Sequence, residues 1–339
     1  MLRVVVIGLG PIGAGCARAI EAESGLELTG LVDTDPRKQG LALSELAQEA
    51  VGPPMESDPG LRIVGDLDEA LEGGADVAVV TATSRFDEAA PLLEQLIERG
   101  VSVVSSCEQM AWPWYNHPEL ARRIDAAAQR AGVTLLGAGV NPGFIMDALP
   151  VMLSSMVRRV SGVRCRRRVD ASLRRPSLQK RIGVALKPET FHQLAQQDKV
   201  GYAGLAESVA LIAAGVGRHA APGSIEETLE PVLAERAIPS PLGLVSPGEV
   251  AGLRNTARWQ GQGVQIELDL TMAVGLADPQ DRIILEGPVP VCLKIPGALP
   301  GDSATVAALL NHIPRLRALK PGLRTRLDVP LVGCSNRDR

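Results

Sequence analysis

This chain has few aromatic residues, few histidines and no excess of positive charge. Aromatic residues make up 2% of its 339 residues, and none stands between the basic residues of the arginine-rich segment 158–175. That segment therefore favours a solvated sheet face or a subunit interface over a nucleic-acid site, which needs stacking rings beside its cations. The formal net charge of -4 likewise disfavours a nucleic-acid partner. The four histidines show no HExxH or HxH spacing, so no metal is predicted.

Signals for disulfides and for membrane insertion are also missing. The five cysteines form an odd, scattered set without a CxxC pair, which is typical of reduced thiols in the cytosol. No stretch reaches the ~18 uninterrupted apolar residues of a membrane helix. Glycines interrupt the N-terminal apolar run after six residues, which predicts a strand rather than a signal peptide. We expect a cytoplasmic protein with no membrane partner.

The length and the apolar pattern predict two domains. A chain of 339 residues with 45% apolar residues exceeds what one core usually serves. Residues 1–149 alternate short apolar runs with helical patterns, which predicts an α/β Rossmann domain with a doubly wound parallel sheet. Residues 150–299 predict an α+β substrate-binding domain with an open mixed, largely antiparallel sheet, which favours a homodimer. A C-terminal helix within 300–339 is expected to complete the first domain.

The individual elements follow from the same runs. Strands are expected at Leu2–Ile7, Leu26–Val32, Ala75–Val80, Val101–Val104, Val133–Leu136, Val157–Ala171, Val264–Val274 and Arg282–Ile295, and helices at Ile12–Ala22, Ala89–Arg99, Pro118–Ala131, Thr190–Gln197, Leu205–Ala214 and Ser303–Leu319.

Residues 8–13 read GLGPIG, a GxGxxG pattern between an expected strand and an expected helix. Gly8 allows the tight turn, Gly10 lets the backbone approach a pyrophosphate, and Gly13 lets the helix pack closely on the strand. Pro11 and Ile12 open the helix, whose free N–H groups would face the phosphates. The pattern predicts an NAD or NADP site.

The segment after the second strand bears on the choice between these cofactors. Asp33 stands twenty residues after Gly13 and suits the ribose hydroxyls of NAD. Arg37 and Lys38 follow, and a guanidinium there suits the 2′-phosphate of NADP. A solvated charge run at a helix start explains them equally well. We expect both cofactors to be used, with Thr34 also beside the dinucleotide.

Polar residues follow two further expected strands. Thr81, Ala82 and Thr83 come where a parallel strand ends, an edge where ligands of such sheets collect. They suit the nicotinamide ribose, although an ordinary βα turn explains them as well. Ser106 and Glu108 follow the next strand. A carboxylate there suits proton transfer, while the pattern alone favours a surface acid in the first turn of a helix.

A glycine-rich turn closes the first domain in GAGVNPGF, residues 137–144. Its glycines permit a close approach of backbone to ligand, and the Asn141 amide can reach cofactor or substrate. A turn at a domain junction is the alternative. Met110 and Phe144 are candidates for apolar pocket walls, and core packing is the competing explanation for both.

Several motifs in order resemble the 2,4-diaminopentanoate dehydrogenases and related native amine dehydrogenases, within the wider dihydrodipicolinate reductase-like group. They are VVVIGLGPIG, VDTDPRK, SSCEQMAWPW, GAGVNPGFIMDALP, VDASLRRPSLQKRIG and GDSATVAALLNHIP. The resemblance implies that Glu108 is the catalytic residue and that the loop Asn141–Phe144 lies beside the nicotinamide and the substrate. The paired histidines, lysine and DAPSGTA stretch of true dihydrodipicolinate reductases are absent from the sequence, which disfavours a heterocyclic diacid.

The activity implied is reversible oxidative deamination. An amine would give a ketone or aldehyde plus ammonia, with hydride passing to NAD(P)+. Three alternatives stay open: a 2,4-diaminopentanoate dehydrogenase acting on a diamino acid, a non-catalytic NAD(P)-binding sensor, and an oxidoreductase acting on alcohols or on 2-amino acids.

Overall fold

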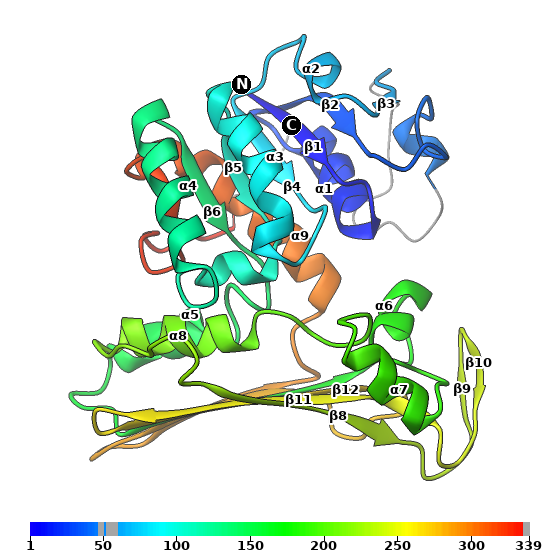
Figure 1. Cartoon of the computed structure of the whole chain (residues 1–339), viewed down its shortest axis with the longest axis vertical. Helices are drawn as coiled ribbons and strands as arrows, with labels where there is room; N and C mark the ends of the chain where they lie inside the picture. The colour runs from blue at the N-terminus through cyan, green and yellow to red at the C-terminus, as the bar shows by residue number, and fades with distance from the viewer. Residues whose placement is uncertain (47–50, 52–59, 335–339) are drawn as a thin grey trace. The chain divides into compact units, whose positions relative to one another are not determined.

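A computed structural model describes residues 1–46, 51 and 60–334 of the chain (Figure 1). The chain forms two compact units, Met1–Phe144 with Pro300–Arg339, and Ile145–Leu299. Residues 335–339 of the expected C-terminal segment lie outside the described residues. The first boundary falls five residues before position 149, where the sequence pattern placed it. Beyond this boundary, the Asp147 carboxylate accepts a hydrogen bond from Ser208 within the second unit at 2.9 Å.

The first unit contains a seven-stranded sheet in which all strand pairs are parallel. Its strand order is β15-β6-β5-β4-β1-β2-β3 (Figure 1). The strands are β1 (Leu2–Ile7), β2 (Leu26–Val32), β3 (Ile63–Val64), β4 (Val77–Val80), β5 (Ser102–Ser105), β6 (Thr134–Gly137) and β15 (Gly322–Arg324). The order reverses beside β1, which makes this a doubly wound sheet as the sequence predicts. The sequence pattern did not reveal the edge strands β3 and β15.

Both faces of this sheet are covered by helices. Alternate residues of β1 separate into two cores, with Val4 and Val6 on one face and Val5 and Ile7 on the other. The first face packs against α1 (Pro11–Ala22) and α9 (Gly301–His312), and the second against α3 (Phe86–Glu98) and α4 (Pro118–Ala131). Burial on both faces explains why the strand reads as an unbroken apolar run.

Two helices differ from their expected bounds for identifiable reasons. The helix α3 begins at Phe86 instead of Ala89, because the side-chain oxygen of Gln109 accepts the Phe86 backbone N–H at 2.8 Å. The helix expected over 303–319 ends at His312 and continues as the 3-10 segment Ile313–Ala318. Pro314 stands at the start of that segment and lacks the N–H that an α-helix needs.

The second unit contains a six-stranded mixed sheet in the order β14-β13-β7-β12-β11-β8. Only the pair β7 and β12 is parallel. Its strands are β7 (Gly162–Asp170), β8 (Glu226–Leu233), β11 (Val250–Gly261), β12 (Val264–Ala273), β13 (Gln280–Glu286) and β14 (Val291–Pro296), and β9 (Ile238–Ser240) with β10 (Gly243–Val245) forms a separate ribbon. The expected single strand over 282–295 is a hairpin, and β8 and β11 were not expected.

Helices cover one face of this second sheet. They are α5 (Ala148–Ser154), α6 (Pro176–Arg181), α7 (Pro188–Ala195) and α8 (Leu205–Gly215). The helix α8 packs against β11 and β12 and is buried from Leu205 to Ala213. Over residues 1–46, 51 and 60–334, no helix has the length and apolar character needed to cross a membrane.

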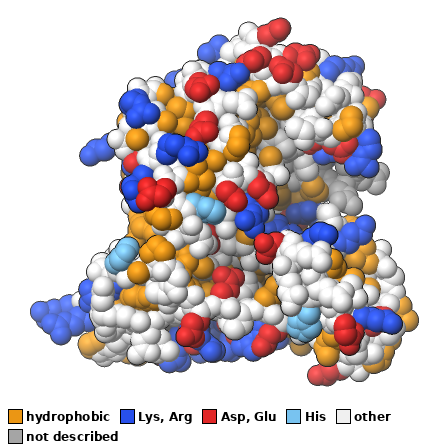
Figure 2. Space-filling model, viewed as in Figure 1, with side chains coloured by type: hydrophobic (Ala, Val, Ile, Leu, Met, Phe, Trp, Pro, Cys, Tyr) orange, Lys and Arg blue, Asp and Glu red, His pale blue; other side chains and the backbone are white. Residues whose placement is uncertain are grey.

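The opposite face of the second sheet is charged. Along β7, Arg164 and Arg166 are exposed while Cys165 between them is buried. Arg164 pairs with Glu286 at 2.6 Å, and Arg166 lies 3.4 Å from Asp269. In Figure 2, Lys, Arg, Asp and Glu side chains gather along the lower edge, where Figure 1 draws this sheet. Arg164 and Arg166 of the arginine-rich segment therefore belong to an ion-paired sheet face.

Candidate active site

Five parallel strands of the first unit end in one row. Ile7 pairs with Val32 on one side and with Val80 on the other, and the row continues through Ser105 to Gly137. Gly8, Asp33, Thr81 and Ser106 stand one residue beyond this row, and the predicted segment 137–144 begins within it at Gly137. The fold thus brings to one sheet edge five segments that are far apart in the sequence, and ligands of doubly wound sheets bind at this edge.

The glycine turn has the shape that a dinucleotide requires. Gly8 has a φ of +89°, and a Cβ there would lie 2.8 Å from the backbone of Ala82. A Cβ at Gly13 would lie 1.9 Å from the Gly8 carbonyl oxygen, so this position holds α1 against β1. A Cβ at Gly10 would meet no atom of the described residues within 4 Å. The backbone at Gly10 is therefore open to a phosphate, and these residues fit a bound NAD(P).

Pro11 is the first residue of α1, and Ile12 follows it. The cap residue Gly10 has no side chain to satisfy the first N–H groups of the helix. These groups are available to an anion at the positive end of the helix dipole.

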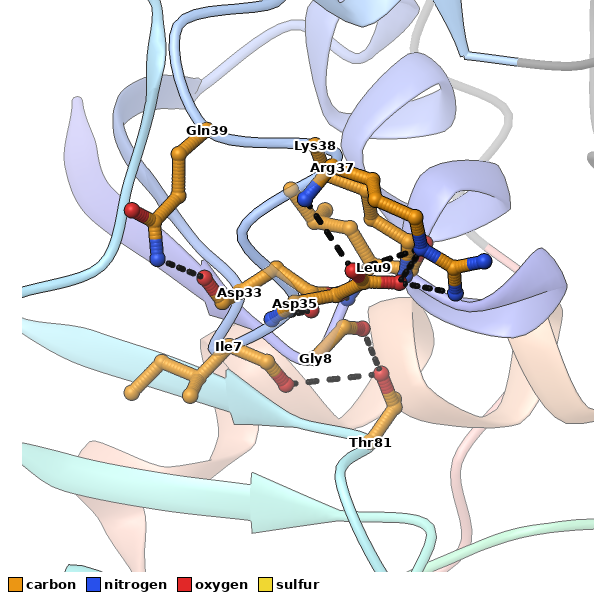
Figure 3. Close-up of polar contacts among 9 residues, drawn as sticks. All are labelled: Ile7, Gly8, Leu9, Asp33, Asp35, Arg37, Lys38, Gln39 and Thr81. Carbon is orange, nitrogen blue, oxygen red and sulfur yellow. Dashed lines mark hydrogen bonds and ion pairs between the residues drawn. The ribbon is translucent and has the colours of Figure 1, made fainter.

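Asp33 ties the end of β2 to the glycine turn (Figure 3). Its side chain is buried, and one carboxylate oxygen accepts the Leu9 backbone N–H at 2.7 Å and the Lys38 ammonium at 2.7 Å. The other oxygen accepts the Asp35 backbone N–H at 2.9 Å. Thr34 beside it is exposed. The acid that was predicted to bind ribose therefore already has a cationic partner.

Arg37 lies outside this cluster. Its guanidinium pairs with Asp35 at 2.7 Å, and its side chain is 87% exposed. The hydrogen bond from Arg37 lowers the pKa of the Asp35 carboxyl to about 2. The two side chains thus remain oppositely charged at neutral pH.

The three residues after β4 lie differently from one another. The Thr81 hydroxyl donates to the Gly8 carbonyl oxygen at 2.6 Å and so fastens this turn to the glycine turn (Figure 3). Ala82 is exposed. The Thr83 hydroxyl bonds to Glu88 in the first turn of α3 and accepts the Arg85 N–H at 3.2 Å. Thr81 positions the glycine turn, while Ala82 and Thr83 stay predicted cofactor contacts.

Glu108 stands on a braced turn. It begins the 3-10 segment Glu108–Ala111 and is half-buried. The Cys107 N–H donates to the Ser105 hydroxyl at 3.1 Å, and the Gln109 N–H donates to the Ser84 carbonyl at 3.2 Å. Because the neighbours of Glu108 are fixed to β5 and to the start of α3, its carboxylate extends from a rigid segment. Such support is what a positioned acid–base group needs.

Met110 and Phe144, the predicted pocket walls, have different surroundings. Met110 is fully buried in the core that contains α3 and α4, while Phe144 is half-buried. A Cβ on Gly137 would lie 2.5 Å from the Met110 carbonyl oxygen, so the Glu108 turn packs directly on the end of β6. Core packing accounts for Met110, and its place in a pocket wall stays a prediction.

The loop after β6 is held by the C-terminal segment. Asn141 is buried, and the bond between Asn141 and Pro142 is cis. The Arg326 side chain donates to the Gly143 carbonyl oxygen at 3.1 Å, and the Val140 N–H donates to the Thr305 hydroxyl at 3.4 Å. Neither Thr305 nor Arg326 was predicted from the sequence, because each is more than 150 positions from its partner. Gln109 is the neighbour of Glu108 in the sequence, and Lys38 lies five residues from Asp33. The motif VDTDPRK already pointed to Lys38 as a candidate.

Comparisons with known proteins identify the family of this chain. Residues 144–338 match the family model of the 2,4-diaminopentanoate dehydrogenase C-terminal domain, and residues 2–138 match the oxidoreductase family with an NAD-binding Rossmann fold. The chain is 29% identical to a 2,4-diaminopentanoate dehydrogenase of Acetoanaerobium sticklandii, over 97% of this chain and 94% of that protein. It is 25% identical to an amine dehydrogenase of Streptomyces virginiae, over 98% of this chain and 97% of that protein.

A solved structure supports the fold over the whole length. The structure of an amine dehydrogenase from Mycobacterium smegmatis superposes with a TM-score of 0.86 at 24% identity, over 98% of this chain and 97% of that one. The predicted fold class, the family resemblance and the prediction of a nicotinamide-dependent oxidoreductase are confirmed. The chain belongs to the 2,4-diaminopentanoate dehydrogenase family and has an NAD-binding Rossmann domain at its N-terminal end.

Proposed function

We propose that this chain is an NAD(P)-dependent amine dehydrogenase that interconverts an amine with a ketone or aldehyde and ammonia. The observation that carries the proposal is the half-buried Glu108 on a braced turn, at the same sheet edge as the glycine turn. A dinucleotide-binding sensor would need the glycine turn but no acid–base group. The names of the relatives, a 2,4-diaminopentanoate dehydrogenase and two amine dehydrogenases, favour amine substrates.

The residues that would hold the dinucleotide follow the row of strand ends. The turn from Gly8 to Gly13 would bind the pyrophosphate, Asp33 the adenosine ribose, and Thr81–Thr83 with Ser106 the nicotinamide ribose. Four neighbouring strands, about 4.8 Å apart, place roughly 14 Å between Asp33 and Ser106, comparable with the span of an extended dinucleotide. When bound, the nicotinamide supplies or accepts the hydride.

Glu108 has two roles in this proposal. As a base, its carboxylate takes the proton from a substrate ammonium, which leaves the neutral amine that can lose hydride, or from the water that attacks the iminium. As an anion, it stabilises the positive charge that develops on the substrate nitrogen. Asn141, on the loop held by Arg326, would contact the substrate or the nicotinamide, and Phe144 would be an apolar wall. This chemistry needs no metal, because the iminium is already electrophilic.

A diamino acid is the second candidate substrate. The family model and the relative from Acetoanaerobium sticklandii carry the name 2,4-diaminopentanoate dehydrogenase, which favours a substrate with an additional amine and a carboxylate. Two turnover measurements separate the candidates. Simple ketones are tested with and without added ammonia, and 2,4-diaminopentanoate is tested for the release of ammonia.

We also propose a cytoplasmic homodimer. The open sheet of the second unit has a face of paired charges, among them Arg254 with Asp269 at 2.9 Å and Arg258 with Glu267 at 3.0 Å. In a symmetric dimer this face would meet the same face of a second copy in an isologous contact. Sedimentation of the protein at several concentrations measures the oligomeric state, and a persistent monomer would contradict this part of the proposal.

Replacing Glu108 by Gln tests the central claim. The amide keeps the shape of the side chain but neither accepts the proton nor carries the charge, so turnover of a small ketone with ammonia and NADPH should fall by about 10²–10⁴-fold. The dissociation constant for NADPH should stay within about twofold, because the glycine turn is untouched.

The matched control is Glu119→Gln, which removes an exposed acid of α4 that pairs with Arg122. Its turnover should equal that of the parent. If Glu108→Gln turns over within a few-fold of the parent, Glu108 is a surface acid and the amine dehydrogenase mechanism fails.

A further inference from the structure

The cluster around Asp33 contains a residue whose contacts reach both the ribose-binding acid and the phosphate-binding turn. The Lys38 ammonium donates to the Asp33 carboxylate at 2.7 Å and to the Leu9 carbonyl oxygen at 3.0 Å (Figure 3). Asp33 also accepts the Leu9 N–H at 2.7 Å. Both polar groups of Leu9, inside the glycine turn, are therefore held by one buried acid and one lysine.

This lysine is partly withdrawn from solvent, and Arg37 is not. The side chains of Lys38 and Asp33 are 27% and 10% exposed, whereas Arg37 is 87% exposed. Arg37 is bound through three hydrogen bonds to the Asp35 carboxylate. Moving Arg37 toward a ligand would leave Asp35 without its counter-charge. The Lys38 ammonium already lies 2.7 Å from the carboxylate of Asp33, the first residue after β2, where the adenosine ribose of a dinucleotide binds.

We infer that Lys38, and not Arg37, determines the relative affinity of this site for NAD, which has a 2′-hydroxyl, and for NADP, which has a 2′-phosphate. A carboxylate beside the ribose normally repels a 2′-phosphate, since like charges at short range raise the free energy of the bound state. Lys38 offsets the charge of Asp33. Two of its three N–H groups bond to Asp33 and Leu9 among the described residues, and the third would be donated to a phosphate oxygen. Asp33 can still accept a hydrogen bond from a ribose hydroxyl. This inference rests on the proposed function only in requiring that the chain binds NAD(P).

The test measures the dissociation constants of NADPH and NADH for Lys38→Met, which keeps most of the side-chain stem and removes the charge. Loss of one charge-assisted hydrogen bond and exposure of the Asp33 charge should weaken NADPH binding by roughly 10- to 100-fold. NADH should change by less than about threefold, because its hydroxyls still find the carboxylate. Titration by nucleotide fluorescence gives both constants without any amine substrate.

Three further variants sharpen the result. Lys38→Arg keeps a cation and should keep most of the NADPH affinity. In the double variant Asp33→Asn with Lys38→Met, the repelling charge is also gone, so NADPH affinity should recover in part. Arg62→Met is the matched control, because Arg62 is an exposed cation of the same unit paired with Glu45 at 3.2 Å, and neither constant should change.

Equal weakening of both cofactors in Lys38→Met would overturn the inference, since Lys38 would then only hold the glycine turn. A selective loss of NADPH in Arg37→Met that exceeds the loss in Lys38→Met would assign the role to Arg37 instead. A parent protein that does not bind NADPH would also overturn the inference. If the predicted selectivity appears but no amine is turned over, only the proposed function fails.

Discussion

The two sheets of this protein differ in where their polar residues lie. The parallel sheet of the first unit has apolar cores on both faces, and the polar residues predicted to bind the cofactor stand where its strands end. The mixed sheet of the second unit has one apolar face and one charged face, and it contains a fully buried ion pair between Arg167 and Asp281. The first arrangement leaves one sheet edge available for a ligand, while the second uses polar groups mainly for structure.

The largest effect on stability is expected at the buried ion pair of the second unit. Arg167 donates to both Asp281 oxygens at 2.6 Å and to the Leu299 carbonyl at 2.7 Å, and Asp281 accepts the Leu299 N–H at 2.8 Å. The pair thus holds the chain where it leaves the second unit. Arg167→Met leaves a buried carboxylate without its cation and should cost about 3–5 kcal/mol of unfolding free energy.

Denaturant unfolding followed by circular dichroism measures this loss. The control Arg258→Met breaks an exposed pair of the same sheet and should cost only about 0.2–1 kcal/mol. Adding Asp281→Leu to Arg167→Met should recover much of the loss, because no charge is then left buried. Equal losses of unfolding free energy for Arg167→Met and Arg258→Met would show that the buried pair stabilises the protein no more than the exposed pair.

The next effect concerns Gly10 and Gly13, two glycines of the first unit to which the GxGxxG pattern assigns different roles. In Gly13→Ala the new Cβ would meet the Gly8 carbonyl oxygen at 1.9 Å, so α1 must move away from β1, at a cost of about 3 kcal/mol. In Gly10→Ala the Cβ has space, so stability should hold while the dissociation constant for NADPH rises.

Thermal unfolding and NADPH titration on the same two proteins check this separation. The comparison fails if Gly10→Ala is as destabilised as Gly13→Ala, or if it binds NADPH as tightly as the parent.

The smallest effect depends on pH and belongs to the first unit. His312 is 4% exposed, and its Nε2 atom is buried without a hydrogen-bond partner among the described residues. Burial, reinforced by the nearby positive charge of Arg326, lowers the pKa of His312 to about 4. Because the unfolded state binds the proton at higher pH, the stability contributed by neutral His312 is lost as the pH falls from about 6.5 toward 4.

His312→Asn is the matching variant, because the amide can keep the hydrogen bond to the Ala308 carbonyl that Nδ1 makes at 2.5 Å. Between pH 7 and pH 5 the parent should lose about 2 kcal/mol more unfolding free energy than the variant. Urea unfolding at the two pH values gives this difference. Parallel pH profiles for the two proteins would contradict the predicted role of burial.

Much of the first unit was predictable because local pattern and burial agree there. An unbroken apolar run such as Leu2–Ile7 indicates a strand covered on both faces, and GLGPIG after it indicates a dinucleotide turn. The second unit was harder, since exposed β8 and the polar residues within β11 disguise both strands. The hairpin of β13 and β14 was merged into one strand because its turn, Gly287-Pro288-Val289-Pro290, remains partly apolar.

The candidate site shows the same limit at the scale of single residues. Local sequence alone identified the glycine turn and Asp33, because each follows a recognisable strand. At Glu108 the pattern alone favours a surface acid, and only the family resemblance implies a catalytic role. Tertiary structure decided that Lys38 bonds to Asp33 while Arg37 pairs with Asp35, although the two cations are neighbours in the chain. It also decided that Thr305 and Arg326 hold the Asn141 loop. Hydrogen bonds between distant segments depend on how the chain returns to the sheet, and no local pattern encodes that return.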